Sequence, residues 1–545
     1  LEKNVKPGRT VCASGLSTIN KSNIIYALCR LKGVTAFCLA SDEKEAQTLC
    51  NDLSCMGLRA YVYPVRDFNF LDFQSRSHEY EHARLKVLLK LINHECDVAI
   101  ACVDAAAQLT VPRNVLEQSV IEFEEGRELS LEKATKALTL LGYERFDAVE
   151  GSGQFSLRGG ILDFFMPDSD YPVRCEFWGD EITDLSYFDI ETQRRFKKAD
   201  KITLSPSTEI VIEDRAALAD KIEHKAKLLR SKNSAKAKEK LFSEAELIRS
   251  GAMIANADKF INQIYDKPES LFDYLDRNTL VFASEFTAIQ ERGKSMDFIS
   301  NETLMQGFED GTLCRGFDRF ALTFNECTEF LQSHGTIVLE NFVHGSMPIK
   351  LSEIISFSTK QLSAWGGSYK QLKEDVDGLF TPESKGVIFA GTERAAKNLC
   401  DTFNADGINA VYSEGADKIS KGELLVMQGA LSAGFEYPSQ KFFAITYSQV
   451  SYRPEKSKKK KKKTGQEIYS LSELAPGDYV VHNVHGIGVF GGIRKIDTHG
   501  VIKDYIKIDY AKGDVLYVPV TQLDMVAKYI GPKEDSRVKL NRLGS

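Results

Sequence analysis

One segment near the start of the chain, GLSTINKS (Gly15 to Ser22), has the residue types and spacing of a phosphate-binding loop. In such a loop backbone N–H groups contact the phosphates, the lysine reaches the terminal phosphates and the hydroxyl holds Mg²⁺. Lys21 and Ser22 are in place, but Asn20 replaces the second glycine. Asn tolerates a left-handed backbone, so the turn can form, although its side chain would crowd the phosphate. Gly15, Asn20, Lys21 and Ser22 therefore make a degenerate phosphate loop, which leaves ATP binding open.

The acidic residues do not complete a nucleotide-hydrolysing site. Asp104 ends the apolar run AIACVD, as a magnesium-positioning Asp does, but no catalytic Glu follows it. The pairs Asp42-Glu43 and Asp180-Glu181 fall on segments with turn or antiparallel character. The chain also lacks an arginine-rich segment that would stabilise transition-state charge. We therefore expect no catalytic residue and no ATPase activity in this chain.

A metal site, a redox-active cysteine pair and a membrane-spanning segment are also disfavoured. His482 and His485 are three residues apart, which puts them on opposite faces of a strand, and no Cys or carboxylate cluster accompanies them. We expect no metal and no cofactor. The 11 cysteines are scattered without a CxxC pair, which favours core positions in a reducing cytoplasm. No apolar run spans a membrane, and a net charge of −7 means that any nucleic-acid contact is local.

Apolar runs alternate with amphipathic segments in the first part of the chain, for example in VTAFCLA (Val34 to Ala40) and RLKVLLKLI (Arg84 to Ile92). This alternation is typical of a parallel sheet with βα units. After the helical pattern that starts at Leu131, short alternating segments with turn residues predict an antiparallel α+β insert. The segment from Gly386 to Ser413 predicts a second α/β unit.

We therefore expect a multidomain α/β protein with a small all-β, barrel-like C-terminal domain. Its expected parts are a parallel-sheet domain, an α+β insert, the helix-led return to the first domain, a second α/β domain, a lysine-rich linker, and the all-β domain with a connector. The corresponding residues are 1–125, 126–210, 211–345, 346–450, 451–470 and 471–545. Six consecutive lysines, Lys458 to Lys463, repel one another and predict a solvated tether. The chain starts without Met and stops at GS, so we expect a piece of a longer protein.

The insert carries residues of the types that dominate protein interfaces. Phe177 and Trp178 are adjacent on a predicted strand, so their rings face opposite sides of the sheet. One ring is expected near solvent beside Arg158 or Arg174, where exposed Trp and Arg would be strong contact residues. The pattern alone leaves open the alternative that both rings are core.

The last part of the chain contains glycine-interrupted strands, in GDYVVHNVHGIGVFGGI (Gly477 to Ile493) and in DYIKIDYAKGDVLYVPVTQLDMV (Asp504 to Val526). Glycines in a strand pattern indicate sharp bends or close backbone approach, and hence a small, strongly twisted barrel. A module of this size is too small for a catalytic domain. We interpret it as an adaptor.

These segments together resemble a known family. FSLRGGILDFF (Phe155 to Phe165), PVRCEFWGDEI (Pro172 to Ile182) and the two glycine-interrupted segments are similar to the N-terminal half of the bacterial transcription-repair coupling factors, the Mfd family. YPVRDFNF (Tyr63 to Phe70) resembles the first domain of that family. The resemblance covers nearly the whole chain.

The resemblance implies a module similar to UvrB, whose insert binds UvrA, and a CarD-like, Tudor-like domain that binds the RNA polymerase β subunit. The UvrA-binding residues would be Arg158, Arg174 and Trp178. The polymerase-binding residues would be Leu516, Tyr517 and Val518, by strand addition at an exposed edge. The chain lacks the aromatic hairpin with which UvrB clamps damaged DNA. The family's motor, with its ATP, Mg²⁺ and most of its DNA contacts, would be absent from this chain.

We therefore interpret the chain as the non-motor half of a coupling factor, which links stalled RNA polymerase to UvrA in the cytoplasm. One alternative is an ATP-dependent UvrB-type helicase subunit in which GLSTINKS is a working site. Another is a CarD-like regulator with an unrelated N-terminus. The sequence leaves open the role of residues 346–450 and whether another domain masks the UvrA surface.

Overall fold

The computed structural model describes 15 stretches of the chain, which divide into two units, Leu1–Val450 and Ser451–Ser545. Each unit is described by itself below. The described residues are 7–66, 79–118, 121–229, 234–251, 257–342, 347, 349–362, 368–415, 419–447, 465–467, 477–482, 486–498, 501–511, 514–519 and 526–529. Lys458 to Lys463, His485 and the expected connector at the chain end lie outside these residues.

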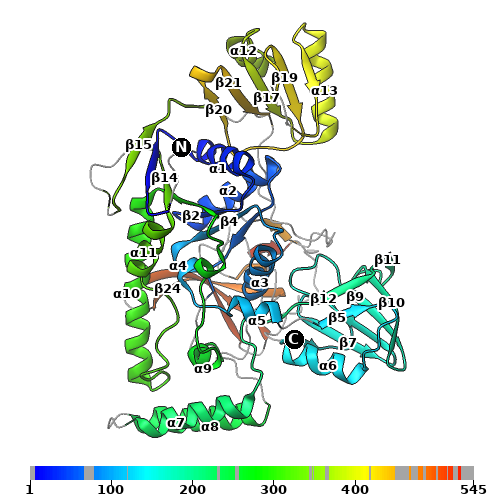
Figure 1. Ribbon diagram of the computed structural model, residues 1–545, viewed down its shortest axis with the longest axis vertical. Helices are drawn as coiled ribbons and strands as arrows, with labels where there is room; N and C mark the ends of the chain where they lie inside the picture. Colours follow the sequence, from blue (N-terminus) through cyan, green and yellow to red (C-terminus); the bar gives the residue numbers. More distant parts are fainter. Residues whose placement is uncertain are drawn as a thin grey trace. The chain divides into compact units, whose positions relative to one another are not determined.

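A seven-stranded parallel sheet forms the centre of the first unit (Figure 1). The five inner strands are buried along their whole length, which explains their mostly apolar sequences, whereas the edge strand Glu353–Ser356 is partly exposed. The parallel-sheet domain expected from the sequence is confirmed. The sheet extends beyond residue 345, where the sequence suggested a boundary, because β15 pairs with β1. In spatial order the strands are β15 (Glu353–Ser356), β1 (Val11–Ser14), β14 (Thr336–Glu340), β13 (Leu280–Ser284), β2 (Ala36–Ala40), β4 (Val98–Cys102) and β3 (Ala60–Tyr63).

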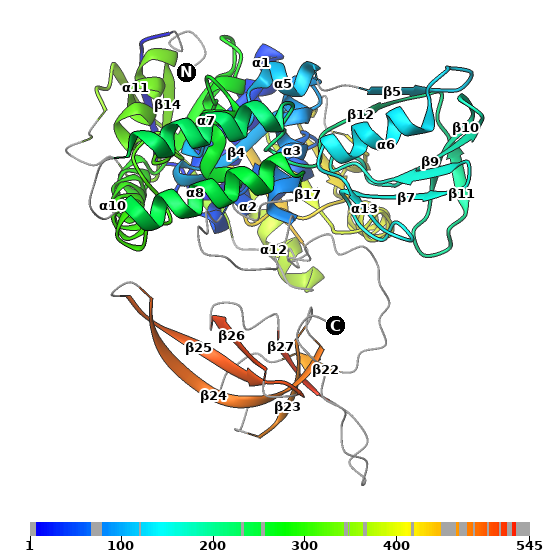
Figure 2. The ribbon, with the colours of Figure 1, turned by 90° about the horizontal axis from the view of Figure 1, so that it is seen from below.

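Helices cover both faces of this sheet. α1 (Thr18–Lys32) and α2 (Glu43–Cys55) pack on one face, and α3 (Glu79–Ile92), α10 (Phe286–Asp310) and α11 (Phe324–His334) pack on the other. α7 (Arg215–Leu228) and α8 (Ser234–Arg249) form a helical pair, side by side in Figures 1 and 2. The shorter helices are α4 (Val103–Ala107), α5 (Arg113–Gln118), η2 (Ala257–Phe260), α9 (Ile261–Ile264) and η3 (Leu271–Tyr274).

The insert is a six-stranded sheet whose one face is covered by α6 (Leu131–Leu140), as Figure 2 shows. All neighbouring strands are antiparallel except β6 and β7, which are parallel. In spatial order they are β11 (Arg195–Lys198), β10 (Glu181–Phe188), β9 (Val173–Trp178), β8 (Ile161–Phe164), β7 (Gln154–Arg158) and β6 (Glu144–Arg145). β5 (Ile121–Glu124) pairs with β12 (Lys201–Leu204) where the chain enters and leaves the insert.

A second α/β domain follows, with α12 (Tyr369–Leu379) and α13 (Glu393–Ala405) packed on one face of a six-stranded sheet. The neighbouring strands β21, β17, β19 and β18 are parallel to one another. β20 pairs with β21 in the antiparallel direction, and β16 pairs with β20 in the same way. In spatial order the strands are β16 (Lys360–Leu362), β20 (Gly434–Tyr437), β21 (Phe442–Thr446), β17 (Lys385–Phe389), β19 (Glu423–Met427) and β18 (Ala410–Tyr412), with η4 (Pro438–Gln440) between β20 and β21.

The second unit is an all-antiparallel sheet with strongly curved central strands (Figure 2). A register shift between Phe490 and Ile493 coincides with Gly491 and Gly492, and Gly492 has a φ of 93°. Here glycine permits a bulge, which is one of the sharp bends that the sequence suggested. In spatial order the strands are β22 (Gly465–Glu467), β27 (Val526–Tyr529), β23 (Tyr479–His482), β24 (Gly486–Thr498), β25 (Val501–Asp509) and β26 (Val515–Pro519). Closure of this sheet into a Tudor-like barrel stays a prediction.

Among the described helices, none combines the length and the hydropathy that a membrane crossing requires.

Candidate interaction surfaces and the degenerate phosphate loop

Gly15 turns the chain from β1 into α1, as the phosphate-loop pattern predicts. Its φ is 81°, and a Cβ atom at this position would lie 2.3 Å from the carbonyl oxygen of Phe357. The Phe357 N–H donates to the Ser14 carbonyl at 2.9 Å, and the Thr359 hydroxyl donates to the Gly15 carbonyl at 2.7 Å. The glycine is therefore required by the chain's own backbone, which packs directly against the turn.

Lys21 is buried and fully engaged by protein groups. Only 2% of its side chain is exposed, and its Nζ donates to Glu45 Oε1 at 3.2 Å, to Ser284 Oγ at 2.9 Å and to Glu285 Oε1 at 2.6 Å. An ammonium group has three donors, so these contacts use all of them. Lys21 therefore binds carboxylates of the protein in place of a phosphate.

The surroundings of Lys21 are acidic. Burial opposes ionisation of Glu45, but the Lys21 charge and hydrogen bonds from Ser284 and Ser41 hold its pKa below the usual value. Glu340 is fully buried at the end of β14, and burial together with the adjacent Glu285 carboxylate raises the pKa of Glu340 to about 7. A nucleotide phosphate in this place would be close to several carboxyl groups and would be repelled.

The other two members of the motif are also buried. The hydroxyl of Ser17 donates to Asn20 Oδ1 at 2.6 Å, and the hydroxyl of Ser22 donates to Asp52 Oδ2 at 3.4 Å. Asp104, the candidate magnesium-positioning residue, accepts hydrogen bonds from Arg292 Nε at 2.9 Å and Arg292 Nη2 at 2.7 Å. Lys21 and Asp104 thus belong to two separate ion-pair clusters, of which the one around Asp104 is partly exposed.

Replacing Lys21 with methionine will lower the stability of the chain without affecting any response to nucleotide. Loss of the ammonium leaves Glu45, which is 10% exposed, and the half-buried Glu285 without their cation, which costs about 3–5 kcal/mol. Thermal unfolding with and without ATP and Mg²⁺ measures both effects, and Lys44→Met, on the exposed side of α2, is the matched control. A nucleotide-induced rise of the wild-type melting temperature that Lys21→Met abolishes would contradict this assignment.

Metal and thiol chemistry find no support among the described residues. In the ranges given above, no group of three or more His, Cys, Asp or Glu side chains could hold a metal ion. His482 lies on β23, and its partner in the sequence pattern, His485, is outside the described residues. All 11 cysteines are free thiols, and all are buried except Cys55, which is half-buried. Their expected role as core residues is confirmed, and burial raises the pKa of thiols such as Cys12 and Cys50 to about 11.

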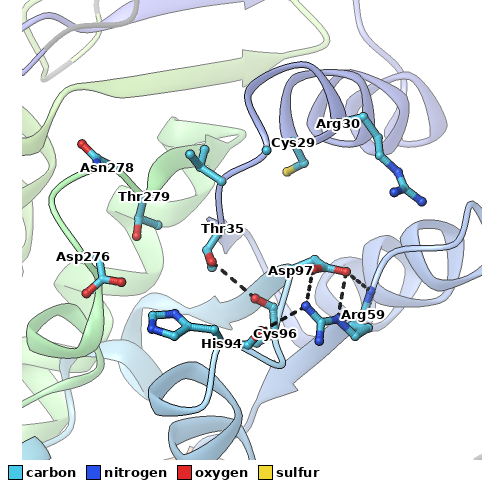
Figure 3. Close-up of a pocket in the computed structure, with 12 residues that line it drawn as sticks. Cys29, Arg30, Thr35, Arg59, His94, Cys96, Asp97, Asp276, Asn278 and Thr279 are labelled. Atoms are coloured by element: carbon cyan, nitrogen blue, oxygen red, sulfur yellow. Dashed lines mark hydrogen bonds and ion pairs between the residues drawn. The ribbon is translucent and has the colours of Figure 1, made fainter.

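A polar groove of about 460 Å³ lies at the opposite end of the parallel sheet (Figure 3). Thr35, Arg59, Asp97 and Thr279, which line it, precede β2, β3, β4 and β13. Arg59 Nη2 donates to Asp97 Oδ1 at 2.7 Å and to the His94 carbonyl at 3.1 Å, so its charge is used internally. Ligands of open α/β sheets bind at the carboxyl ends of the strands. The position and the paired charges of this groove do not indicate a ligand.

The insert presents Trp178 on its uncovered face. Along β9, Val173, Cys175 and Phe177 point into the core beneath α6, and Arg174 and Trp178 point to the other side. Phe177 is 8% exposed and Trp178 is 82% exposed, which resolves the alternatives left by the sequence. Its exposed indole offers a large, rigid apolar area to solvent, and its role as a contact residue stays a prediction.

Two arginines on the same face converge on one buried carboxylate. Asp163 on β8 is 1% exposed and accepts from Arg174 Nε at 2.7 Å, from Arg174 Nη2 at 2.9 Å and from Arg158 Nη2 at 2.7 Å. Arg174 also donates to the Gln193 carbonyl at 3.1 Å and lies over the Phe188 ring at 4.4 Å. Arg174 is thus held on all sides, whereas Arg158 is 49% exposed and keeps donors for a partner.

Asp163 and Gln193 were missed by sequence reasoning. A signal for Asp163 was available, because it is the one charged residue in the apolar strand ILDF. A buried carboxylate requires a cation nearby. Gln193 has a φ of 57°, which no sequence pattern revealed.

In the second unit, β26 is an edge strand that pairs with β25 alone among the described strands. Val518 is buried in the core and Leu516 packs against it from the same side. Tyr517 is 44% exposed and Val515 is also exposed, so they form the outer side of the strand. The three residues that the sequence singled out therefore lie together on an edge strand, with only Tyr517 directed away from the core.

Comparisons with known proteins agree with this arrangement. Residues 121–210 match the family model of the UvrB interaction domain, and residues 474–530 match that of the CarD-like/TRCF RID domain. The chain is 30% identical to a transcription-repair-coupling factor of Bacillus subtilis (strain 168) over 97% of the chain and 46% of the relative. It is 28% identical to the protein of the same description from Staphylococcus haemolyticus, over 89% of the chain and 42% of the relative. The chain thus spans less than half the length of these curated relatives.

Proposed function

From its relationship to the transcription-repair-coupling factors along nearly its whole length, we propose that this chain joins RNA polymerase to the excision-repair protein UvrA. The insert would bind UvrA, and the C-terminal domain would bind the polymerase. The observation that carries the proposal is the presence, in one chain, of an insert with a solvent-exposed Trp on the sheet face that also carries Arg158, and of a CarD-like domain with an open edge strand.

The UvrA-binding surface is the uncovered face of the insert. Trp178 would insert into an apolar pocket of UvrA, and Arg158 would donate to an acidic or carbonyl group beside that pocket. Arg174, which the resemblance also implies as a contact, has a mainly positioning role in this proposal. It donates four hydrogen bonds to Asp163 and Gln193, and these hold in place the carboxylate that Arg158 also contacts.

The polymerase-binding surface is β26, at Leu516, Tyr517 and Val518. A strand of the polymerase β subunit would pair with the open edge, so that main-chain hydrogen bonds supply affinity and Tyr517 supplies a side-chain contact. Leu516 and Val518 would contribute by holding the edge strand on the core.

The chain would contribute no ATP hydrolysis of its own. ATP, Mg²⁺ and most DNA contacts belong, in this proposal, to the part of the relatives that the chain does not span, and the complex would act in the cytoplasm. The rival, a UvrB-type ATP-dependent helicase subunit, requires Lys21 to release two carboxylates before it can meet a phosphate.

Immobilised chain should retain purified UvrA and bacterial RNA polymerase at the same time. Leu516→Arg should remove only the polymerase, and the double variant Arg158→Ala with Arg174→Ala should remove only UvrA. Each variant is the folding control for the other surface, because the two surfaces lie in different units. Failure of the wild-type chain to retain either protein would refute the proposal.

A further inference from the structure

The degenerate phosphate loop keeps its shape although its surroundings do not suit nucleotide. Its residues at the start of α1 divide between two sides. Lys21 points into the parallel-sheet domain, towards Glu45 and Glu285. Ile19 points the other way and is buried in an apolar cluster that the second α/β domain supplies. That cluster includes Val387, Phe389, Leu425, Met427, Leu431 and Phe435.

A buried carboxylate on α2 fixes the same contact with hydrogen bonds. Asp52 is fully buried, its Oδ1 accepts from the Ser432 N–H at 2.7 Å, and its Oδ2 accepts from the Ser432 hydroxyl at 2.7 Å. The Ser22 hydroxyl donates to the same Oδ2 at 3.4 Å, so the motif's last residue belongs to this group. Burial raises the pKa of Asp52 to about 6, because these hydrogen bonds compensate for desolvation only in part.

Close backbone approach marks a third point of the contact. Gly429 has a φ of 113°, and a Cβ atom there would lie 2.5 Å from the Cys55 sulfur at the end of α2. The chain that leads towards the second α/β domain also runs over the loop, because Phe357 and Thr359 bond to Ser14 and Gly15. Apolar packing, a buried hydrogen-bonded carboxylate and a required glycine thus meet on one surface.

We propose that the former phosphate loop and the end of α2 are the docking surface of the second α/β domain, which stays seated there and closes the site to nucleotide. The occupant is the segment from β19 to β20 of this same chain. Within the motif Gly15 makes the turn, Ile19 packs against the docked domain, Ser22 donates to the Asp52 carboxylate that contacts it, and Lys21 anchors α1 to the sheet. The second α/β domain, whose role the sequence left open, is then a permanent cap on the UvrB-like domain. This inference does not depend on UvrA or polymerase binding.

Alkylation of Cys55 in the full chain, measured peptide by peptide by mass spectrometry, tests the docking. Contact with the second domain keeps Cys55 half-buried, and burial raises its thiol pKa to about 11, so the wild-type sulfur should react slowly. Leu431→Asp should accelerate its alkylation on the order of 10-fold or more, because a charge would enter the apolar cluster. Ser432→Ala should accelerate it a few-fold, because Asp52 would lose one donor.

Two further thiols separate undocking from unfolding. Cys400 is buried in the other core of the second α/β domain, and Cys175 is buried in the insert, so both should stay as slow as in the wild type. Leu247→Asp, on the exposed side of α8, is the matched control and should leave Cys55 slow. If Leu431→Asp also raises the alkylation rate of Cys400, the second domain has unfolded in that variant. The alkylation rate of Cys55 in Ser432→Ala then provides the test of docking. Unchanged Cys55 reactivity in Ser432→Ala, a wild-type Cys55 as reactive as a free thiol, or acceleration by ATP with Mg²⁺ would each overturn the proposal.

Discussion

Trp178→Ala will lower the affinity of the chain for UvrA by roughly 30-fold or more. An exposed Trp at the centre of an interface contributes about 2 kcal/mol or more, and 2 kcal/mol corresponds to roughly 30-fold in the dissociation constant. The indole is 82% exposed in the free chain, so its removal leaves no cavity and the melting temperature should not change. Titration of purified UvrA by calorimetry or surface binding measures the loss.

The controls use neighbouring side chains of the insert. Phe146→Ala removes another exposed ring of the insert and should leave UvrA affinity unchanged. Arg158→Ala should weaken binding at constant stability. Arg174→Ala should weaken binding and also lower the melting temperature, because Asp163 would lose its main cation. If Trp178→Ala and the wild-type chain bind UvrA with equal affinity, Trp178 is not part of the UvrA-binding surface.

Tyr517→Glu will abolish most of the affinity for RNA polymerase, with a loss of about 10-fold or more. Tyr517 lies on the outer side of the edge strand, where an added strand would bury it, and burial of an unpaired carboxylate opposes docking. Because the residue is exposed in the free chain, the domain should keep its melting temperature. Retention of polymerase core enzyme on immobilised chain is the measurement.

Two companion variants make this result specific. Arg494→Glu places the same side chain on an exposed position of β24 and should retain polymerase. Leu516→Arg should lose polymerase but also destabilise the domain, because Leu516 packs against the core beside Val518. If Tyr517→Glu binds polymerase like the wild type while Leu516→Arg does not, the contact lies on the other side of the strand.

Local periodicity was sufficient for several conclusions. Buried parallel strands are recognisable from continuous apolar runs such as AFCLA and VAIAC, because both faces of such a sheet are covered. The alternation of β9 placed Phe177 and Trp178 on opposite faces, since successive side chains of a strand alternate. The position of Gly15 at a turn followed from the motif, because glycine adopts a positive φ at no steric cost.

The sequence by itself thus determined the types of domain, their order and the residues that could form the two interaction surfaces. Only the tertiary structure decided which ring faces solvent, because that depends on where α6 packs. It also gave Lys21 its partners, Glu45 and Glu285, which are 24 and 264 residues away, and brought Ser432 to Asp52 across 380 residues. Such pairs leave no periodic trace in the chain, because they form only when separate elements pack. For that reason the motif that suggested nucleotide binding makes contacts within the folded protein instead, through Lys21 on one side and Ile19 on the other.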